Sequence, residues 1–221
     1  MKNSLLTILG SLLVVTGIAC TPSTGIFLSL LTSDKPVPAM SGLFPDTEPG
    51  YRIIGNTIYI QSSIGDLSQY TGLVEELDHC QGERLVELTT YGGDANTMYV
   101  LSDAIRNSKC EITVHVRGVA ASAGAIIAMS ADHVVLAPGA VLMFHDGQVQ
   151  TAGPRSQVIK RLSFMGHQYE EYLRSNIQGL LSEEEIQGIL NGEEVWLTKS
   201  DFDKRYKDHA SPKASQPSRT N

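Results

Sequence analysis

The sequence predicts an α/β fold in which strands and helices alternate around a mainly parallel sheet. Short apolar runs with strand character, such as 112–116, alternate with longer segments whose apolar residues recur at helical spacing. Glycines and other small residues stand where an expected strand gives way to a helix. This alternation favours parallel neighbours, because a parallel pair of strands needs a crossover connection. With 221 residues and 42% hydrophobic content, the chain is long enough to bury one sizeable core.

The first half of the domain is expected to consist of βα units. Ile53-Ile54 and Ile58-Tyr59-Ile60 flank Gly55-Asn56, a pattern typical of a hairpin or a bulged strand. Further strands are expected at 85–90, 111–117, 133–136 and 141–144, and helices at 67–77, 95–107 and 123–130. The carboxyl ends of the parallel strands should then meet along one edge of the sheet.

Two further helices are expected in the second half of the chain. An i, i+4, i+7 spacing marks one apolar face of a long helix, formed by Val158, Leu162, Met165, Tyr169 and Leu173. Such a stripe is most often part of a core. Ser182 and Glu185 form a capping box, which predicts a helix through Leu190. We expect the folded domain to span 51–206, and the polar segment 207–221 to be a disordered tail.

The beginning of the chain has the composition of a leader. Lys2 precedes an apolar run of about 15 residues, which fits a secretory signal better than a spanning helix. Gly17-Ile18-Ala19-Cys20 resembles a bacterial lipobox, in which Cys20 is acylated. We therefore expect a signal-like leader at 1–19, a linker at 20–50, and a location in the cell envelope, either lipid-anchored or periplasmic. The alternatives are an ordinary signal, an uncleaved anchor and a cytoplasmic location.

Composition argues against several classes of function. The net charge is −7 and the basic residues are scattered, so the chain lacks the basic footprint of a nucleic-acid-binding protein. The six histidines and three cysteines show no metal-ligand spacing. His115, inside an expected strand, is best interpreted as a structural histidine. We therefore expect no metal site, no cofactor and no nucleic-acid partner.

Ser122 is the first candidate catalytic residue, because it lies at an expected strand-to-helix turn. Gly118 to Ala125 reads Gly-Val-Ala-Ala-Ser-Ala-Gly-Ala, so the hydroxyl stands among residues with almost no side chain. A serine at such a turn is exposed at the end of a sheet, and the Ala123 amide and the helix N-terminus favour developing negative charge. The alternative is that Ser122 is an N-cap and that the small residues only allow tight packing.

Two more expected strands are followed by candidate catalytic groups. Gly92-Gly93 follows the strand at 85–90, and a diglycine at such a junction offers an unencumbered amide, the second donor that an oxyanion hole needs. His145 follows the strand at 141–144, and histidine has the unperturbed pKa that suits a general base. Because parallel strands end along one edge, Gly93, Ser122 and His145 are expected to meet there.

These motifs resemble those of the proteolytic subunit of Clp protease, a family of serine peptidases in the crotonase-like superfamily. The resemblance is carried by Tyr91-Gly92-Gly93, Gly118 to Ala125 and Met143-Phe144-His145, in the family's order, and covers about 51–198. It implies βα repeats around a mainly parallel sheet, with Ser122 as nucleophile, His145 as general base, and the amides of Gly93 and Ala123 as oxyanion donors. Thr90-Tyr91 replaces the family's usual Ser-Pro before the diglycine.

The resemblance implies Glu194 as the third member of a catalytic triad. The family has an aspartate just before a short aromatic-Leu-Ser/Thr stretch, and here Trp196-Leu197-Thr198 places Glu194 at that position. A glutamate can orient a histidine, because the role requires a carboxylate on the far imidazole nitrogen. The alternatives are that Glu193 and Glu194 are a solvated pair, and that Asp146, Asp201 or Asp203 takes the role.

The resemblance also bears on partners. In the family the long helix projects as a handle between two rings, so a homo-oligomer of stacked rings acting on polypeptides is implied. An ATP-driven unfoldase is a possible partner only in the cytoplasm, since an exported domain would lack ATP. Cys80 and Cys110 each close a helix before a strand, at the edge opposite the candidate site. They are expected to be either a disulfide, if the domain is exported, or two buried thiols.

The leading functional hypothesis is a serine endopeptidase that hydrolyses peptide bonds through an acyl-enzyme. A phage-type protease that trims capsid or scaffold proteins is a second possibility. A catalytically silent ring subunit is a third, and the presence of Ser122 and His145 argues against it. A crotonase-like acyl-CoA enzyme would share the oxyanion hole but would need neither of these side chains.

Overall fold

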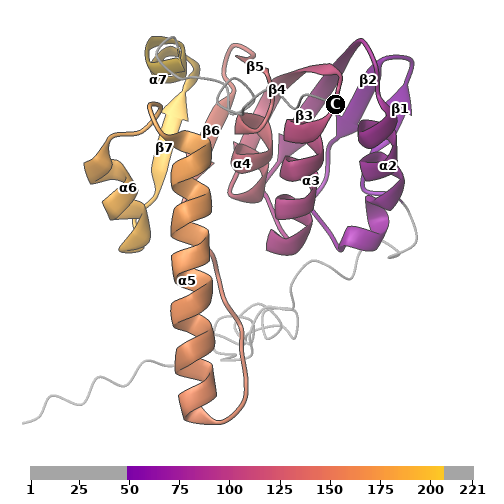
Figure 1. The fold of residues 1–221 in the computed structure, drawn as a ribbon. Helices are drawn as coiled ribbons and strands as arrows, with labels where there is room; N and C mark the ends of the chain where they lie inside the picture. Colours follow the sequence, from indigo (N-terminus) through magenta and orange to yellow (C-terminus); the bar gives the residue numbers. More distant parts are fainter. Residues whose placement is uncertain (1–48, 207–221) are drawn as a thin grey trace, which may run out of the picture. The chain divides into compact units, whose positions relative to one another are not determined.

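A seven-stranded sheet organises the part of the chain that the computed structural model describes, residues 49–206 (Figure 1). The strands lie in the order β1-β2-β3-β4-β6-β7, and β5 pairs with β4 beside this path. Their bounds are β1 Arg52–Ile54, β2 Thr57–Ile60, β3 Glu83–Thr90, β4 Glu111–Ala121, β5 His133–Leu136, β6 Val141–Phe144 and β7 Val195–Thr198. The helices are the 3₁₀ turn η2 Leu67–Gln69, α2 Thr71–His79, α3 Ala95–Asn107, α4 Ala123–Met129, α5 Arg155–Ile177, α6 Glu183–Leu190 and α7 Lys199–Arg205.

The sheet is mainly parallel, as the sequence predicts, with an antiparallel pair at each edge. Strands β2 to β6 run parallel, whereas β1 pairs antiparallel with β2, and β7 with β6. Strand β4 is the longest and has two successive neighbours on the same side. Thr113–Val116 pair with β5, and Val119–Ala121 pair with β6. The end of β4 therefore lies between β3 and β6, at the centre of the sheet.

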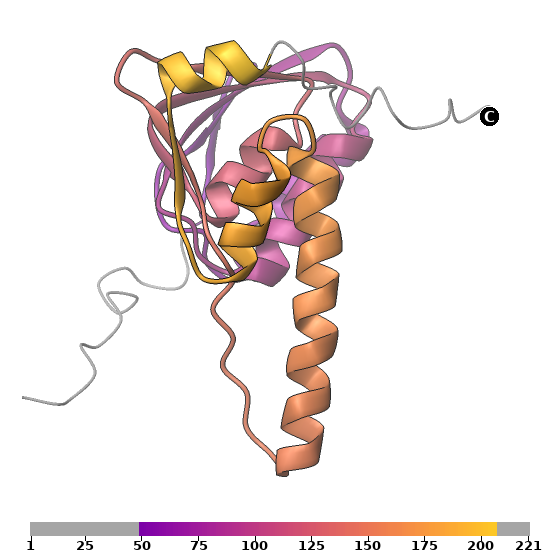
Figure 2. The same ribbon diagram turned by 90° about the vertical axis from the view of Figure 1, so that its left-hand side faces the viewer.

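One face of the sheet is covered by helices and forms the core. Along β2 the side chains of Ile58 and Ile60 are buried, whereas those of Thr57 and Tyr59 between them are half-buried. Helices α2, α3, α4 and α5 lie side by side (Figure 1), all on this one side of the sheet (Figure 2). Burial that alternates along β2 is expected when helices cover one face of the sheet, because successive side chains of a strand point to opposite faces.

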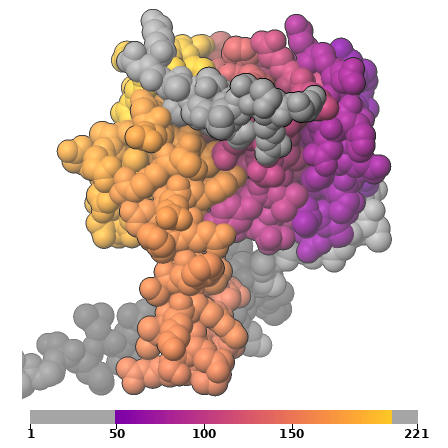
Figure 3. All heavy atoms as spheres, viewed as in Figure 1, coloured from indigo at the N-terminus to yellow at the C-terminus, as the bar shows by residue number. Residues whose placement is uncertain are grey.

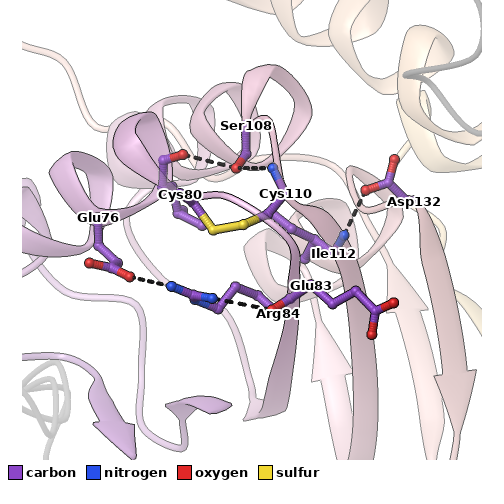
Figure 4. The surroundings of a disulfide bond; sticks show 9 residues. Glu76, Cys80, Glu83, Arg84, Ser108, Cys110, Ile112 and Asp132 are labelled. Atoms are coloured by element: carbon purple, nitrogen blue, oxygen red, sulfur yellow. Dashed lines mark hydrogen bonds and ion pairs between the residues drawn. A yellow bond between two sulfur atoms is a disulfide. The ribbon is translucent and has the colours of Figure 1, made fainter. Parts of the chain in front are cut away.

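The amino ends of the strands are cross-linked by a disulfide between Cys80 and Cys110 (Figure 4). Cys80 directly follows α2 and Cys110 directly precedes β4, so the bond lies at the edge where β3 and β4 begin. Both side chains are buried. The Ser108 hydroxyl donates to the Leu77 carbonyl at 2.9 Å and accepts from the Cys110 amide at 3.2 Å. Of the two states that the sequence left open, the structure therefore has the disulfide.

Helix α5 divides into a packed half and a projecting half. Its buried residues are Leu173, Asn176 and Ile177 near its end, whereas almost all residues from Arg155 to Gln168 are exposed. The space-filling view shows the first half of α5 standing out from the body (Figure 3). The apolar stripe that the sequence predicts is thus core only at its end. Its first part, including Leu162 and Met165, is open to solvent.

Most expected elements are present with small shifts at their ends. The helix at 95–107 and the strands at 133–136 and 141–144 have the predicted bounds, and Ser182 and Glu185 form the predicted capping box. Strand β4 continues through Gly118 to Ala121, beyond its predicted end. The sequence pattern does not predict strand β7 or helix α7, because elements of four and seven residues carry little periodicity.

Several expectations fall outside the described residues. The leader at 1–19, the acylation of Cys20, most of the linker at 20–50 and the tail at 207–221 stay predictions. Between residues 49 and 206, no helix is both long and apolar enough to cross a membrane.

Candidate active site

Ser122 stands in the turn between β4 and α4 in a strained backbone conformation. Its φ of 54° and ψ of −122° make it the one residue other than glycine with a positive φ in the described range. Such a conformation costs on the order of 1–3 kcal/mol and persists only where the surroundings impose it. The Ser122 amide donates to the Met143 carbonyl at 2.9 Å, which ties the turn to β6. Ser122 occupies the N-cap position of α4, but its side chain makes no capping hydrogen bond there.

The diglycine after β3 packs directly against this turn. A Cβ atom on Gly92 would lie 2.7 Å from the Ala121 carbonyl oxygen and 2.7 Å from the Cβ of Ser122. Gly92 also has a φ of 95°, and Gly93 a φ of 150°. Glycine is therefore required here for two reasons, the backbone conformation and the close approach to Ser122. The Gly92 amide donates to the Thr90 hydroxyl at 3.0 Å, which holds the turn.

The hydrogen bonds around Gly93 determine where its amide points. Ile64 donates its amide to the Gly92 carbonyl at 2.9 Å and accepts from the Asp94 amide at 2.8 Å. The Gly92 carbonyl and the Gly93 N–H belong to one trans peptide unit and point in opposite directions, so the Gly93 N–H points away from Ile64. Ala123 is the first residue of α4, so its N–H has no acceptor within the helix. These are the two donors that the sequence predicts for an oxyanion.

His145 is the first residue beyond β6, two residues after the carbonyl that accepts from Ser122. Its own carbonyl accepts a hydrogen bond of 2.6 Å from the hydroxyl of Tyr169 on α5. Burial, and secondarily the nearby Asp146 carboxylate, raise the pKa of Tyr169 well above its usual value. The Tyr169 hydroxyl is therefore a permanent donor. The sequence pattern identifies Tyr169 only as part of the apolar face of a helix and does not predict its contact with His145. The one feature that sets Tyr169 apart from the rest of that face is its hydroxyl group.

Glu194 directly precedes β7, as His145 directly follows β6. The β6–β7 pairs run from Val141 with Thr198 to Phe144 with Val195, where the ladder ends, and one further pair in the same register would join His145 and Glu194. The Glu194 carboxylate accepts a hydrogen bond of 2.9 Å from the indole N–H of Trp196. No hydrogen bond between Glu194 and His145 is present within residues 49–206. The triad role of Glu194 therefore stays a prediction that its position supports.

The other acidic candidates are engaged elsewhere. Asp201 accepts from the Thr198 hydroxyl at 2.6 Å, which lowers the pKa of Asp201, and Asp203 pairs with Lys199 at 2.5 Å. Both lie in α7, beyond the end of β7 that is farther from His145. The carboxylate of Asp146 accepts from the next amide along the chain at 2.8 Å. The carboxylate of Glu193 lies against Gly188 of α6. Position thus favours Glu194 over the three aspartates, whereas Glu193 and Glu194 are both exposed, as the alternative of a solvated pair expects.

His115 has the structural role that the sequence predicts. Its Nδ1 lies 3.3 Å from the carboxylate of Glu87, which also binds Arg117 through two hydrogen bonds of 2.5 and 3.0 Å. The hydrogen bonds from Arg117 are the main cause that lowers the pKa of the buried Glu87. In the described part of the chain, the histidines, cysteines and acidic residues form no cluster of three or more that suits a metal ion.

Comparison with known proteins gives one family and one curated relative. The sequence profile of the Clp protease family, described as "Clp protease", matches residues 58–184. A segment of 76 residues is 34% identical to "Membrane protein NfeD1b" of Bacillus subtilis (strain 168). This segment is 33% of the chain but covers only 17% of the length of that relative. The family match includes Gly93, Ser122 and His145 and ends before Glu194.

Proposed function

This chain belongs to the Clp protease family and has its crotonase-like fold, and from that premise we propose that it is a serine endopeptidase. The observation that carries the proposal is the strained Ser122 turn, against which the diglycine packs so closely that only glycine fits. A serine held at positive φ between a strand and a helix is the arrangement of an exposed nucleophile. A role in packing alone would be met by alanine and would need no strain.

The proposed reaction proceeds through an acyl-enzyme. The Ser122 hydroxyl attacks the carbonyl carbon of the scissile peptide bond while His145 takes the hydroxyl proton. The amides of Gly93 and Ala123 donate to the oxyanion that forms. His145 then gives the proton to the leaving amine, and the C–N bond breaks. Water attacks the acyl-enzyme, His145 takes the water proton, and Ser122 regains it as the peptide acid leaves. Glu194 orients the imidazole.

The proposed substrate is an extended polypeptide, and the proposed assembly is a homo-oligomer of stacked rings. The projecting half of α5 supports the assembly, because it exposes apolar side chains that a monomer would leave in water. Phe164 is 70% exposed, and Ile159, Leu162 and Met165 lie near it on the same helix. Tyr91 precedes the diglycine and is 77% exposed, so its ring is free to contact a substrate side chain.

The proposed location is the cell envelope. The buried disulfide between Cys80 and Cys110 supports it, because such bonds persist in oxidising compartments and are rare in the cytosol. The name of the curated relative, a membrane protein, is consistent with this location. A protease working there would not depend on an ATP-driven unfoldase, and would act on peptides or on segments that are already unfolded.

A fluorophosphonate probe tests the proposed function, because it reacts covalently with activated serines. We expect the full-length protein to be labelled at Ser122 and to cleave an unstructured peptide. Ser122→Ala should abolish both with no change in assembly, and His145→Ala should reduce the labelling rate by several orders of magnitude. An unlabelled, inactive wild-type oligomer would instead identify a catalytically silent subunit. Peptide cleavage that survives in Ser122→Ala would exclude Ser122 as the nucleophile.

A further inference from the structure

The backbone carbonyl of the candidate general base accepts a hydrogen bond from helix α5, at the point where the chain leaves the sheet. The ladder between β6 and β7 ends at Phe144 and Val195, so His145 is the first residue beyond it. Residues 145–154 then form no helix or strand and run down beside the projecting half of α5 (Figure 2). The hydrogen bond recorded for the main chain of His145 comes from the side chain of Tyr169, 24 residues later.

Tyr169 lies where α5 joins the body. On its amino-terminal side the helix is exposed, and on its carboxyl-terminal side the helix packs through Leu173 and Ile177. The ring of Tyr169 packs against the hydrophobic core, and its hydroxyl lies 2.6 Å from the His145 carbonyl oxygen. This distance is at the short end of the range for O–H···O hydrogen bonds. A ring fixed by packing and a short hydrogen bond together leave the carbonyl little freedom.

We propose that Tyr169 is a positioning residue, whose hydroxyl holds the backbone of His145 so that the imidazole faces Ser122. The proposal rests on the proposed function, since it assigns to Tyr169 a part in the same reaction. Tyr169 does not touch the reacting atoms. It acts through the main chain of His145, at the point where the sheet no longer constrains it.

The hydrogen bond from Tyr169 matters because the rate of proton transfer falls steeply when the general base is displaced. A general base must lie within hydrogen-bond reach of the proton that it takes. A displacement of about 1 Å in a catalytic group can reduce the rate by about a hundredfold. Loss of the Tyr169 hydroxyl would widen the range of positions that His145 samples. The proposed oxyanion donors lie in the turn after β3 and at the start of α4 and would stay in place, so substrate binding should change little.

Tyr169→Phe and Tyr172→Phe form a matched pair for the test. Each removes one hydroxyl from α5, and the two positions are three residues apart. The ring of Tyr172 makes an edge-on contact with Tyr99, and the Arg106 guanidinium lies over it. We would measure the unfolding temperature, kcat and KM for an unstructured peptide, and the rate of fluorophosphonate labelling of the assembled full-length protein. A third variant, with 4-aminophenylalanine at 169, restores an N–H donor at the same place.

We expect Tyr169→Phe to lower kcat and the labelling rate about tenfold or more, with KM changed less than about twofold. Tyr172→Phe should stay within about twofold of wild type in kcat, KM and the labelling rate. The variant with 4-aminophenylalanine at 169 should recover most of the lost kcat. Equal activities of the two phenylalanine variants would overturn the inference, as would a loss that 4-aminophenylalanine does not recover. An inactive, unlabelled wild type would instead overturn the proposed function, so the two failures are distinguishable.

Discussion

The two ends of the parallel strands differ in how they are constrained. We call the end where β3, β4 and β6 stop the site edge, and the end where β3 and β4 begin the disulfide edge. At the edge where β3, β4 and β6 end, Ser122 has a φ of 54°, Gly92 a φ of 95°, and His145 lies just beyond the ladder. At the edge where β3 and β4 begin, Cys80 and Cys110 form a disulfide, and Asp132 accepts the Ile112 amide at 2.7 Å (Figure 4). The first edge contains strained and open positions, whereas the second is cross-linked.

From this difference we infer that the proposed catalysis and the stability of the fold depend on opposite ends of the strands. Backbone strain at a site survives only when the surrounding structure over-determines it. The disulfide contributes to the stability that offsets this strain, because a cross-link restricts the unfolded chain. If the comparison is right, substitutions at the site edge change turnover more than stability, and substitutions at the disulfide edge do the reverse.

The largest effect is expected from Glu194→Gln at the site edge. The amide keeps the shape of the side chain but favours the wrong imidazole tautomer of His145, so turnover should fall by a factor on the order of thousands. The unfolding temperature should not change. Steady-state peptide cleavage and thermal unfolding, measured on the same preparation, check both statements.

The controls for Glu194→Gln are Asp146→Asn, Asp201→Asn and Asp203→Asn, which should have far smaller effects on turnover. A reversed ranking would move the third catalytic role to the aspartate that proved sensitive. Small, equal effects of all four would indicate that Ser122 and His145 work as a dyad.

The next effect is expected from Gly92→Ala. The added Cβ would lie 2.7 Å from both the Ala121 carbonyl oxygen and the Ser122 Cβ, so the diglycine has to shift and the Gly93 donor moves with it. Displacing one oxyanion donor should lower kcat by about 10²–10³. Gly139→Ala is the matched control, because Gly139 also has a positive φ, 83°, but its Cβ would meet open space. If both variants lost turnover equally, strain alone would explain the effect.

The disulfide edge should respond in the opposite way. Replacing both Cys80 and Cys110 by alanine removes a cross-link that spans 30 residues. Such a link stabilises by about 3–4 kcal/mol in the chain-entropy account, so the free energy of unfolding should fall by about that amount. Chemical denaturation measures the fall. Turnover at a temperature where the variant stays folded should be unchanged, and a large loss there would show that the two edges are coupled.

The smallest effect concerns the strain stored at Ser122. Ser122→Ala and Ser122→Gly both remove the nucleophile, but only glycine adopts a φ of 54° without a steric penalty. Relief of about 1–3 kcal/mol of strain is partly offset by about 1 kcal/mol of glycine backbone entropy. Ser122→Gly should therefore be more stable than Ser122→Ala by about 1 kcal/mol in the free energy of unfolding. Equal stability of the two variants would mean that the turn stores no strain.

Much of the fold follows from local signals that can be identified in the sequence. Helix α3 has the predicted bounds because Asp94 caps it, with its carboxylate accepting from the Thr97 amide at 2.7 Å. Helix α6 begins where its capping box predicts. The three motifs lie at strand ends because glycines and small residues interrupt apolar runs there. For the same reason, the sequence predicts that Gly93, Ser122 and His145 share one edge of a parallel sheet.

By itself, the sequence determined the order of the elements as far as α6, the parallel sheet and the edge at which the candidate site is expected, because hydrophobic periodicity and turn residues act over a few residues. Only the tertiary structure decided the register between β6 and β7, and with it that Glu194 directly follows the last residue paired with β6 in the direction of His145. It also decided the pairing of Cys80 with Cys110, the division of α5 into a packed and a projecting half, and the hydrogen bond from Tyr169 to His145. Each of these joins residues far apart in the chain, where no local pattern specifies distance or direction.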